Sequence, residues 1–185
     1  MMLDRILAFI MLIGLSPVFI VVLLLIIFDD GLPVFFIQKR VGVNYSFFRL
    51  YKFRTMKKNT PNVATHLLGS PEQYVLGIGR ILRKLSLDEL PNLLNIIKGD
   101  MVFVGPRPAL YNQDDLMQLR VDAGVSHLKP GLTGWAQING RDEISLKEKV
   151  ALEKEYLERK SFLFDVKIFF MTFLSAFFKK EGVSH

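Results

Sequence analysis

GRILRKLSLDELPNLLNIIKGD, residues 79–100, determines the middle of the fold, because it places the adjacent carboxylates Asp88 and Glu89 beside an apolar helix face. Apolar residues after the pair recur at helical spacing, and Lys98-Gly99 ends the pattern, so we expect a helix buried on one side. The recurring positions are Leu90, Leu93, Leu94 and Ile97. We also expect the basic segment 78–85 to be helical.

Two explanations of the carboxylate pair remain open at this point. Ser86 and Glu89 have the spacing of a capping box, so Ser86 could cap a helix whose positive end favours both acidic residues. In the other explanation the pair carries chemistry, with the neighbouring basic residues as its partners. In both, Pro91 lies near the first turn and the pair is at a helix entrance.

The composition fits one compact domain with an accessory segment. The chain has 185 residues, half of them hydrophobic, and a formal net charge of +6. This charge favours anionic partners, among which nucleic acid, phosphorylated substrates and acidic lipids all qualify. The absence of cysteine excludes a disulfide framework, a thiolate metal site and a cysteine nucleophile.

Both ends of the chain are strongly apolar. Residues 6–28 carry no charge and are long enough, at about 1.5 Å per residue, to cross a bilayer core as one straight helix. Ser16-Pro17 interrupts them, so the segment is either a kinked spanning helix or two short halves that return to the same side. Residues 162–178 contain seven phenylalanines interrupted by polar residues, which suits a helix lying at an interface or an amphipathic core helix.

Three further segments offer candidate ligand groups. Residues 47–56 alternate apolar and basic residues, which fits a strand or an interfacial segment with its basic residues at a headgroup or phosphate surface. Residues 101–110 are strand-like and carry Arg107 between two prolines. Residues 127–142 are rich in glycine and indicate a ligand loop. Each has a structural alternative, respectively a solvated basic face, a rigid surface turn and glycine turns without a ligand. The candidates are Arg49, Lys52 and Arg54 in the first segment and Trp135, Gln137 and Arg141 in the last.

Other segments are assigned no chemistry. We expect residues 33–37 to be extended, 38–42 to form a polar turn and 57–73 to form a loop. Residues 145–160 read as a charged helix exposed to solvent. Gly77-Ile78-Gly79 lacks the third glycine of a dinucleotide fingerprint, and the histidines lack metal-ligand spacing.

Five motifs, in this order after one apolar segment, closely resemble those of the bacterial monotopic phosphoglycosyl transferases. They are KFRTM (52–56), SLDELPN (86–92), KGDMVFVGPRP (98–108), PGLTGWAQINGR (130–141) and SFLFDVK (161–167). Residues 71–79, PEQYVLGIG, depart from the commonest family pattern, so no role is carried onto them.

The resemblance implies a membrane-associated α/β fold at the cytoplasmic face of the bacterial inner membrane. Residues 1–30 would form a re-entrant helix broken at Ser16 and Pro17. Residues 31–185 would form the catalytic domain, with a small sheet element and amphipathic interfacial helices. The expected partners are a UDP-sugar, undecaprenyl phosphate, membrane lipids and downstream glycosyltransferases, with no nucleic acid.

The resemblance also implies a reaction, in which a sugar 1-phosphate passes from the UDP-sugar to undecaprenyl phosphate with release of UMP. Asp88 would be the nucleophile that forms a covalent phosphosugar, and Glu89 would help to hold Mg²⁺. Arg83 and Arg107 would contact substrate phosphates, and Lys52, Arg54, Gln137 and Arg141 complete the expected substrate contacts. The alternatives are a non-catalytic membrane-surface scaffold that binds acidic lipid or nucleic acid, and a metal-dependent phosphatase.

Overall fold

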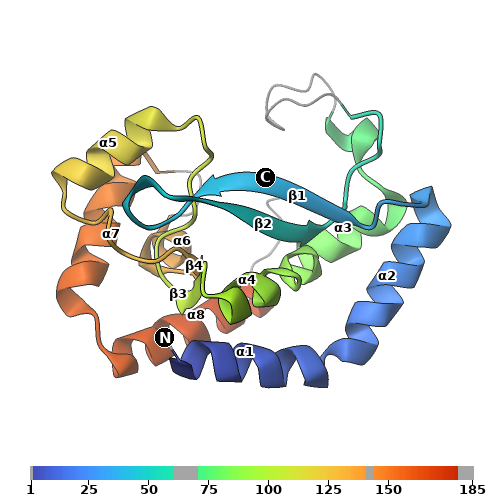
Figure 1. Ribbon diagram of the computed structural model, residues 1–185, viewed down its shortest axis with the longest axis horizontal. Helices are drawn as coiled ribbons and strands as arrows, with labels where there is room; N and C mark the ends of the chain where they lie inside the picture. Colours follow the sequence, from blue (N-terminus) through green and yellow to red (C-terminus); the bar gives the residue numbers. More distant parts are fainter. Residues whose placement is uncertain (1, 61–70, 141–143, 179–185) are drawn as a thin grey trace.

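The structure is a computed structural model that describes residues 2–60, 71–140 and 144–178 (Figure 1). Eight α-helices, three 3-10 turns and four short strands occur in these ranges. In chain order they are α1 (Met2–Gly14), α2 (Ser16–Asp30), β1 (Phe35–Val41), η1 (Val43–Tyr45), β2 (Phe47–Phe53), η3 (Pro71–Tyr74), α3 (Gly77–Lys84), η4 (Leu87–Glu89), α4 (Asn92–Lys98), β3 (Val102–Val104), α5 (Asp114–Asp122), β4 (Gly131–Thr133), α6 (Trp135–Asn139), α7 (Leu146–Arg159) and α8 (Phe162–Phe178). The fold is thus a mixed α/β fold with little sheet.

The described strands form two separate two-stranded sheets. Strands β1 and β2 pair as an antiparallel hairpin, and β3 pairs in parallel with β4. The expected polar turn at residues 38–42 is wrong, because β1 continues to Val41, whose amide donates to the Ala109 carbonyl at 3.0 Å. Alternate residues of the extended strand then face opposite sides, so Gln38 and Arg40 share one face of the hairpin with Lys52.

The N-terminal apolar segment forms two helices with a bend of 63° between them. Pro17 has no N–H to give the Ile13 carbonyl, and the Ser16 hydroxyl donates to that oxygen at 2.7 Å instead. Among the described residues no single helix has both the length and the apolar character for a membrane crossing, whereas α1 and α2 taken together do.

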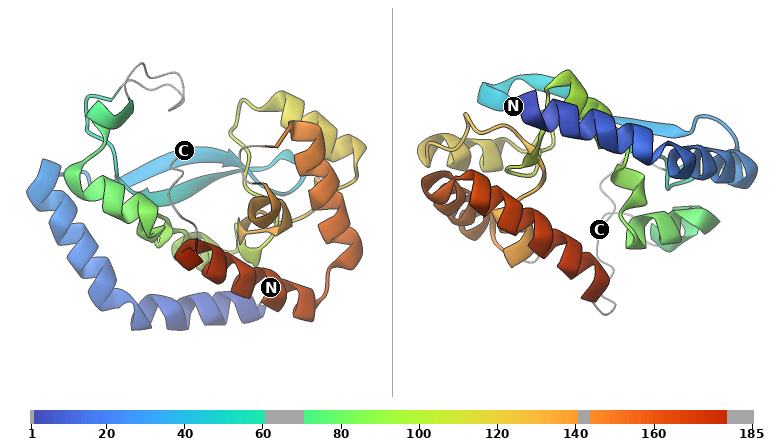
Figure 2. Two further views of the ribbon diagram at one scale, coloured as in Figure 1. Left: turned by 180° about the vertical axis from the view of Figure 1, so that it is seen from behind. Right: turned by 90° about the horizontal axis from the view of Figure 1, so that it is seen from below.

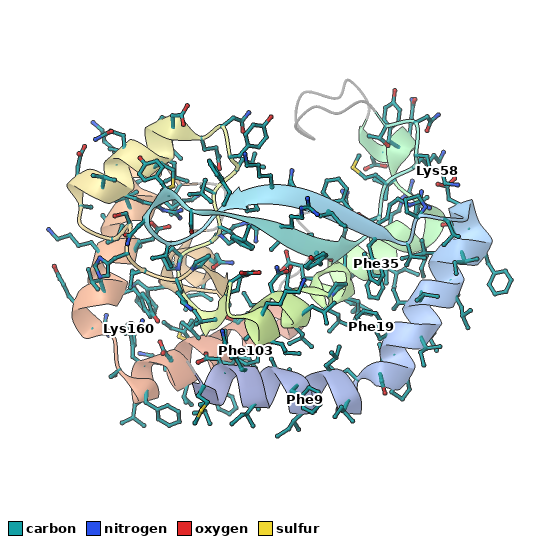
Figure 3. The ribbon with its side chains drawn as sticks, in the orientation of Figure 1. Phe9, Phe19, Phe35, Lys58, Phe103 and Lys160 are labelled. Atoms are coloured by element: carbon teal, nitrogen blue, oxygen red, sulfur yellow. The ribbon has the colours of Figure 1, made fainter. Side chains whose placement is uncertain are left out.

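The two helices pack into different apolar clusters. Ala8 of α1 is fully buried in a cluster with Leu93 and Ile96 of α4, and the Arg5 guanidinium donates to the Lys98 carbonyl at 3.0 Å. The α2 helix packs on the hairpin and on α3, and the rings of Phe19 and Phe53 lie 4.7 Å apart. In Figure 3 Phe19 of α2 and Phe35 of β1 lie between α2 and the hairpin, whereas Phe9 points away from the body of the protein.

Helices α7 and α8 each bury one side against the rest of the protein. The expectation that residues 145–160 only face solvent is wrong, because Val150, Glu153 and Tyr156 of α7 are buried where α7 packs on its neighbours. Helix α8 is amphipathic, with Phe164 and Ile168 buried and a set of exposed apolar side chains on the other side. Helices α1 and α8 run along the lower side in Figure 1, and both are visible in the view from below in Figure 2.

Candidate active site

The carboxylate pair lies on η4, a short 3-10 turn ahead of helix α4. Ser86 has a left-handed backbone, with φ of 55°, and its side chain makes no capping hydrogen bond. Helix α4 begins only at Asn92, after Pro91. The explanation of Ser86 as a helix cap is therefore wrong. The prediction that the pair lies at a helix entrance is confirmed.

Two cations from distant parts of the chain meet the carboxylate of Glu89. Lys52 Nζ of β2 lies 2.7 Å from Glu89 Oε1, and Nη1 of Arg107 lies 3.7 Å from the same oxygen. The side chains of Lys52 and Glu89 are 19% and 22% exposed, so water and ligands can still reach this ion pair. The structure thus brings together three of the residues singled out from the sequence.

Asp88 is mostly buried beside Glu89. Burial raises the pKa of Asp88 to about 6, and the negative charge of Glu89 acts in the same direction, whereas the cations Lys52 and Arg83 oppose the rise. A carboxylate with this pKa is largely ionised at neutral pH, and it is more basic than an ordinary aspartate. Such a group is suited to act as a nucleophile.

Arg83 reaches this neighbourhood because α3 packs closely against residue Thr55. A side chain at Gly79 would overlap the Thr55 carbonyl, so glycine permits the close approach. Arg83 Nε then donates to Thr55 Oγ1 at 2.9 Å. Burial lowers the pKa of Arg83, and the charge of Asp88 acts against that shift. Gly79 therefore serves helix packing.

Arg40 is a site residue that the sequence interpretation missed. Its guanidinium donates to Gln38 Oε1 at 3.0 and 2.6 Å and to the Pro108 carbonyl at 3.0 Å. Burial and the charge of Arg107 lower the pKa of Arg40 to about 10, whereas Glu89 opposes this shift. No local signal marks it, because residues 38–40 are all polar and the strand continues past Ile37 only through its pairing with β2.

A cleft of about 260 Å³ lies beside Glu89. Its walls come from the hairpin, from η4 and α4, from the loop that carries Arg107 and from β4. The lining residues are Arg40, Leu50, Lys52, Glu89, Asn92, Met101, Arg107, Pro108, Gly131 and Leu132. Three cations and one carboxylate in so small a space favour a ligand with several negative charges.

Arg107 is held in place through its own backbone. Its carbonyl accepts a hydrogen bond of 2.9 Å from Nη2 of Arg120, and Arg120 forms a two-point ion pair with Glu153 at 2.5 and 2.8 Å. The glycine-rich segment supports the same loop, because a side chain at Gly131 or Gly134 would overlap the backbone of Gly105. These glycines allow close packing, and Gly131 and Leu132 also line the cleft, so the segment both supports the loop and forms part of the cleft wall.

The remaining expected substrate contacts lie elsewhere. Arg54 is buried and directs its guanidinium to Asp30 and to the carbonyls of residues 30, 31, 33 and 56, so it fastens the end of α2. Gln137 does not line the cleft, and its amide donates to the Leu132 carbonyl at 3.3 Å. Arg141 lies outside the described residues.

Asp88 and Glu89 could supply only part of the ligands of a Mg²⁺ ion. Within residues 2–60, 71–140 and 144–178, no three His, Cys, Asp or Glu side chains converge as a metal cage. Mg²⁺ commonly uses one or two carboxylates, with water and substrate phosphates as its other ligands. Asp88 and Glu89 fit that donor set, and a bound cation would oppose the two effects that raise the pKa of Asp88, which are burial first and the charge of Glu89 second.

Comparison with known proteins identifies the family. The family model described as bacterial sugar transferase matches residues 1–179. The chain belongs to this family, the bacterial phosphoglycosyl transferases. The resemblance found from the five motifs is thus confirmed.

Three relatives within the family illustrate its range. Exopolysaccharide production protein ExoY of Sinorhizobium fredii is 40% identical over 186 residues, which span 91% of this chain and 81% of ExoY. The uncharacterized sugar transferase EpsL of Bacillus subtilis is 46% identical over 77% of this chain and 69% of its own length. The UDP-glucose:undecaprenyl-phosphate glucose-1-phosphate transferase of Escherichia coli is 37% identical, over 97% of this chain and 40% of its own length.

Proposed function

We propose that this protein transfers a sugar 1-phosphate from a UDP-sugar to undecaprenyl phosphate and releases UMP. The observation that carries the proposal is the cleft lined by Lys52, Glu89 and Arg107, with Asp88 next to Glu89 and the charge of Arg83 acting on Asp88. The name of the similar Escherichia coli protein states this kind of reaction, with glucose as the sugar. The product would begin the assembly of a membrane-linked glycoconjugate.

Asp88 is assigned as the nucleophile and Glu89 as the supporting carboxylate. Glu89 Oε1 already pairs with Lys52 and lies near Arg107, whereas burial leaves Asp88 with the raised pKa of a more basic carboxylate. A carboxylate can approach a diphosphate only where cations offset the charge repulsion. Lys52, Arg83 and Arg107 supply this positive charge. Mg²⁺ held by Glu89 and Asp88 would neutralise further charge on the diphosphate.

The reaction then takes two displacements at one phosphorus atom. An oxygen of Asp88 bonds to the phosphorus that carries the sugar, and the bond from that phosphorus to the UMP oxygen breaks, so that UMP leaves with the electron pair. A phosphate oxygen of undecaprenyl phosphate next attacks the same phosphorus. The bond to Asp88 breaks, and the carboxylate is regenerated. One cleft thus serves the soluble donor and the lipid acceptor in turn.

We also propose that α1 and α2 enter the cytoplasmic leaflet of the bacterial inner membrane and return to the same side. The 63° bend and the Ser16 hydrogen bond to Ile13 support a stable re-entrant shape. Apolar side chains exposed on α1, α2 and α8 support contact with lipid. The most exposed of them are Met2, Leu3, Phe28, Phe162, Leu163 and Phe170.

The reaction is tested by measuring UMP release from a panel of UDP-sugars with the purified protein, undecaprenyl phosphate and Mg²⁺. We expect release with at least one donor, formation of a lipid-linked sugar diphosphate, and a labelled sugar-phosphate adduct on the protein. Replacing Asp88 with Asn should abolish turnover and the adduct. A substantially active Asp88→Asn variant would contradict the nucleophile assignment.

Two other outcomes would replace the proposed reaction. No UMP from any UDP-sugar would favour a membrane-surface scaffold that binds acidic lipid through the basic residues. Release of inorganic phosphate without a lipid-linked sugar would favour a phosphatase.

The membrane arrangement is tested by labelling with a thiol reagent that does not cross the bilayer. The chain has no cysteine, so single cysteines introduced at the exposed positions Met2 and Leu32 report without background. A re-entrant segment predicts that both are labelled from the cytoplasmic side. Labelling of the two positions from opposite sides of the membrane would show a spanning helix.

A further inference from the structure

Asn92 is the first residue of α4, and its buried amide has an oxygen without a partner. The residue is 3% exposed, and among the described residues no donor reaches its Oδ1. A buried polar atom without a hydrogen bond destabilises the folded state, and a leucine of similar shape would avoid this penalty. Asn92 lines the same cleft as Glu89, Lys52 and Arg107.

The three cations of the cleft make their contacts with other acceptors. Lys52 Nζ bonds to Glu89, Arg40 donates to Gln38 and to the Pro108 carbonyl, and Arg107 lies near Glu89. None of the three donates to Asn92 Oδ1. The amide oxygen can therefore be satisfied by a hydrogen-bond donor that enters the cleft with a ligand.

Asn95, one turn further along α4, shows how a buried amide is satisfied in this fold. Its Oδ1 accepts from the Tyr51 amide at 3.1 Å, and its Nδ2 donates to the Arg49 carbonyl at 2.7 Å. Asn95 is fully buried and joins α4 to β2. The two asparagines thus share a helix and a similar degree of burial, but within the described part of the chain only the Oδ1 of Asn95 has a donor.

We propose that Asn92 binds a hydroxyl group of the sugar that is transferred. The proposal rests on the proposed function and extends it to donor recognition. Phosphate oxygens at neutral pH accept hydrogen bonds and cannot satisfy an amide oxygen, whereas sugar hydroxyls donate. Asn92 follows Asp88 by four residues and lines the cleft beside Glu89, so the proposal puts the transferred sugar at Asn92 when its phosphorus is within reach of Asp88. Gln137, the other described residue whose buried amide oxygen lacks a partner, does not line the cleft.

The test compares Asn92→Leu with Asn95→Leu in the full chain, purified in nanodiscs with Mg²⁺. Binding of UDP and of UDP-glucose, UDP-galactose, UDP-N-acetylglucosamine and UDP-N-acetylgalactosamine is measured in an Asp88→Asn background, where no chemistry follows. We expect Asn92→Leu to weaken the preferred UDP-sugar about tenfold and to leave UDP binding unchanged within about twofold, as for the loss of one hydrogen bond to the sugar. Asn92→Leu should not lower the unfolding midpoint, whereas Asn95→Leu should lower it and affect UDP and UDP-sugar alike.

Deoxy analogues of the preferred donor sharpen this test. The analogue without the contacted hydroxyl should bind equally well with and without the Asn92→Leu substitution, because the contact is already absent. Equal weakening of UDP and UDP-sugar by Asn92→Leu would overturn the proposal, and so would unchanged binding of both. Absence of UMP release by the wild-type protein from every donor would instead contradict the proposed function.

Discussion

Two ion pairs in this protein resemble each other in composition and differ in what surrounds them. The side chains of Arg120 and Glu153 are 7% and 3% exposed and bond to each other at two points. The Lys52–Glu89 pair is 19% and 22% exposed and lines a cleft. Arg107 connects the two, because its backbone bonds to Arg120 while its guanidinium lies near Glu89. We call Arg120–Glu153 the closed pair, which positions the backbone of Arg107. We call Lys52–Glu89 the open pair, whose charges a ligand can reach.

Breaking the closed pair should have the largest effect on stability. Glu153→Gln leaves the Arg120 guanidinium buried without a counter-charge, which costs about 3–5 kcal/mol of the free energy of unfolding. Urea unfolding followed by circular dichroism would measure the loss. A change in the free energy of unfolding below about 1 kcal/mol would show that the Arg120–Glu153 pair is hydrated, like the Lys52–Glu89 pair.

The paired replacement of Arg120 by Met and Glu153 by Leu is the matched control. It removes both charges together, so stability should stay within about 1 kcal/mol of the wild-type value. The Arg107 carbonyl would still lose its donor. We therefore expect UMP release by this double variant to fall about tenfold, the size expected for one misplaced binding group.

Breaking the open pair should instead reduce activity and spare stability. Lys52→Met removes one positive charge from the cleft, so we expect kcat/KM for UMP release to fall about 10²- to 10³-fold. The free energy of unfolding should change by no more than about 1 kcal/mol, since the pair is partly exposed. Lys39→Met is the control, because Lys39 lies on the other face of the same hairpin over the Phe47 ring. Equal losses in the two variants would show that overall charge, and not position, matters.

The smallest expected effect is a pH dependence of stability that comes from Asp88. Its pKa is about 6 in the folded protein, above the ordinary value of 3.8, so the folded state holds this proton more tightly than the unfolded state. The contribution of Asp88 to stability therefore falls as pH rises from about 4 to about 6 and stays low above that. Urea midpoints at pH 5 and pH 7 in EDTA should show the decrease in the wild-type protein. A decrease of the same size in Asp88→Asn would assign it to other groups.

The sequence predicted the helices of the middle segment for clear physical reasons, because helical spacing of leucine and isoleucine defined α4. Of the basic residues near the acidic pair in sequence, Arg83 does act on Asp88. Lys52 and Arg107 were expected as substrate contacts, and only the fold brings them to Glu89. Arg54 shows the limit of this reasoning. A basic residue in a strand pattern does not reveal which carbonyls will surround it, and here they belong to the turn after α2.

Arg40 and the Arg120–Glu153 pair depended on tertiary contacts that no local pattern contains. The polar residues of 38–42 resemble a turn, and only pairing with β2 and the Ala109 carbonyl makes them a strand. The charged pattern of α7 resembles a solvent-exposed helix until α5 packs against it and covers Glu153. Burial of charge is decided by a partner far along the chain.

The contacts of α1 have a practical consequence for anyone who wishes to study the chemistry in water. Arg5 holds the carbonyl at the end of α4, and Ala8 fills a space against the same helix that begins with Asn92. Removal of residues 1–30 would uncover Leu93 and Ile96 on the helix that follows the turn carrying Asp88 and Glu89. A truncated version would therefore lose packing next to this turn, and detergents or lipid discs are the better route to a working sample.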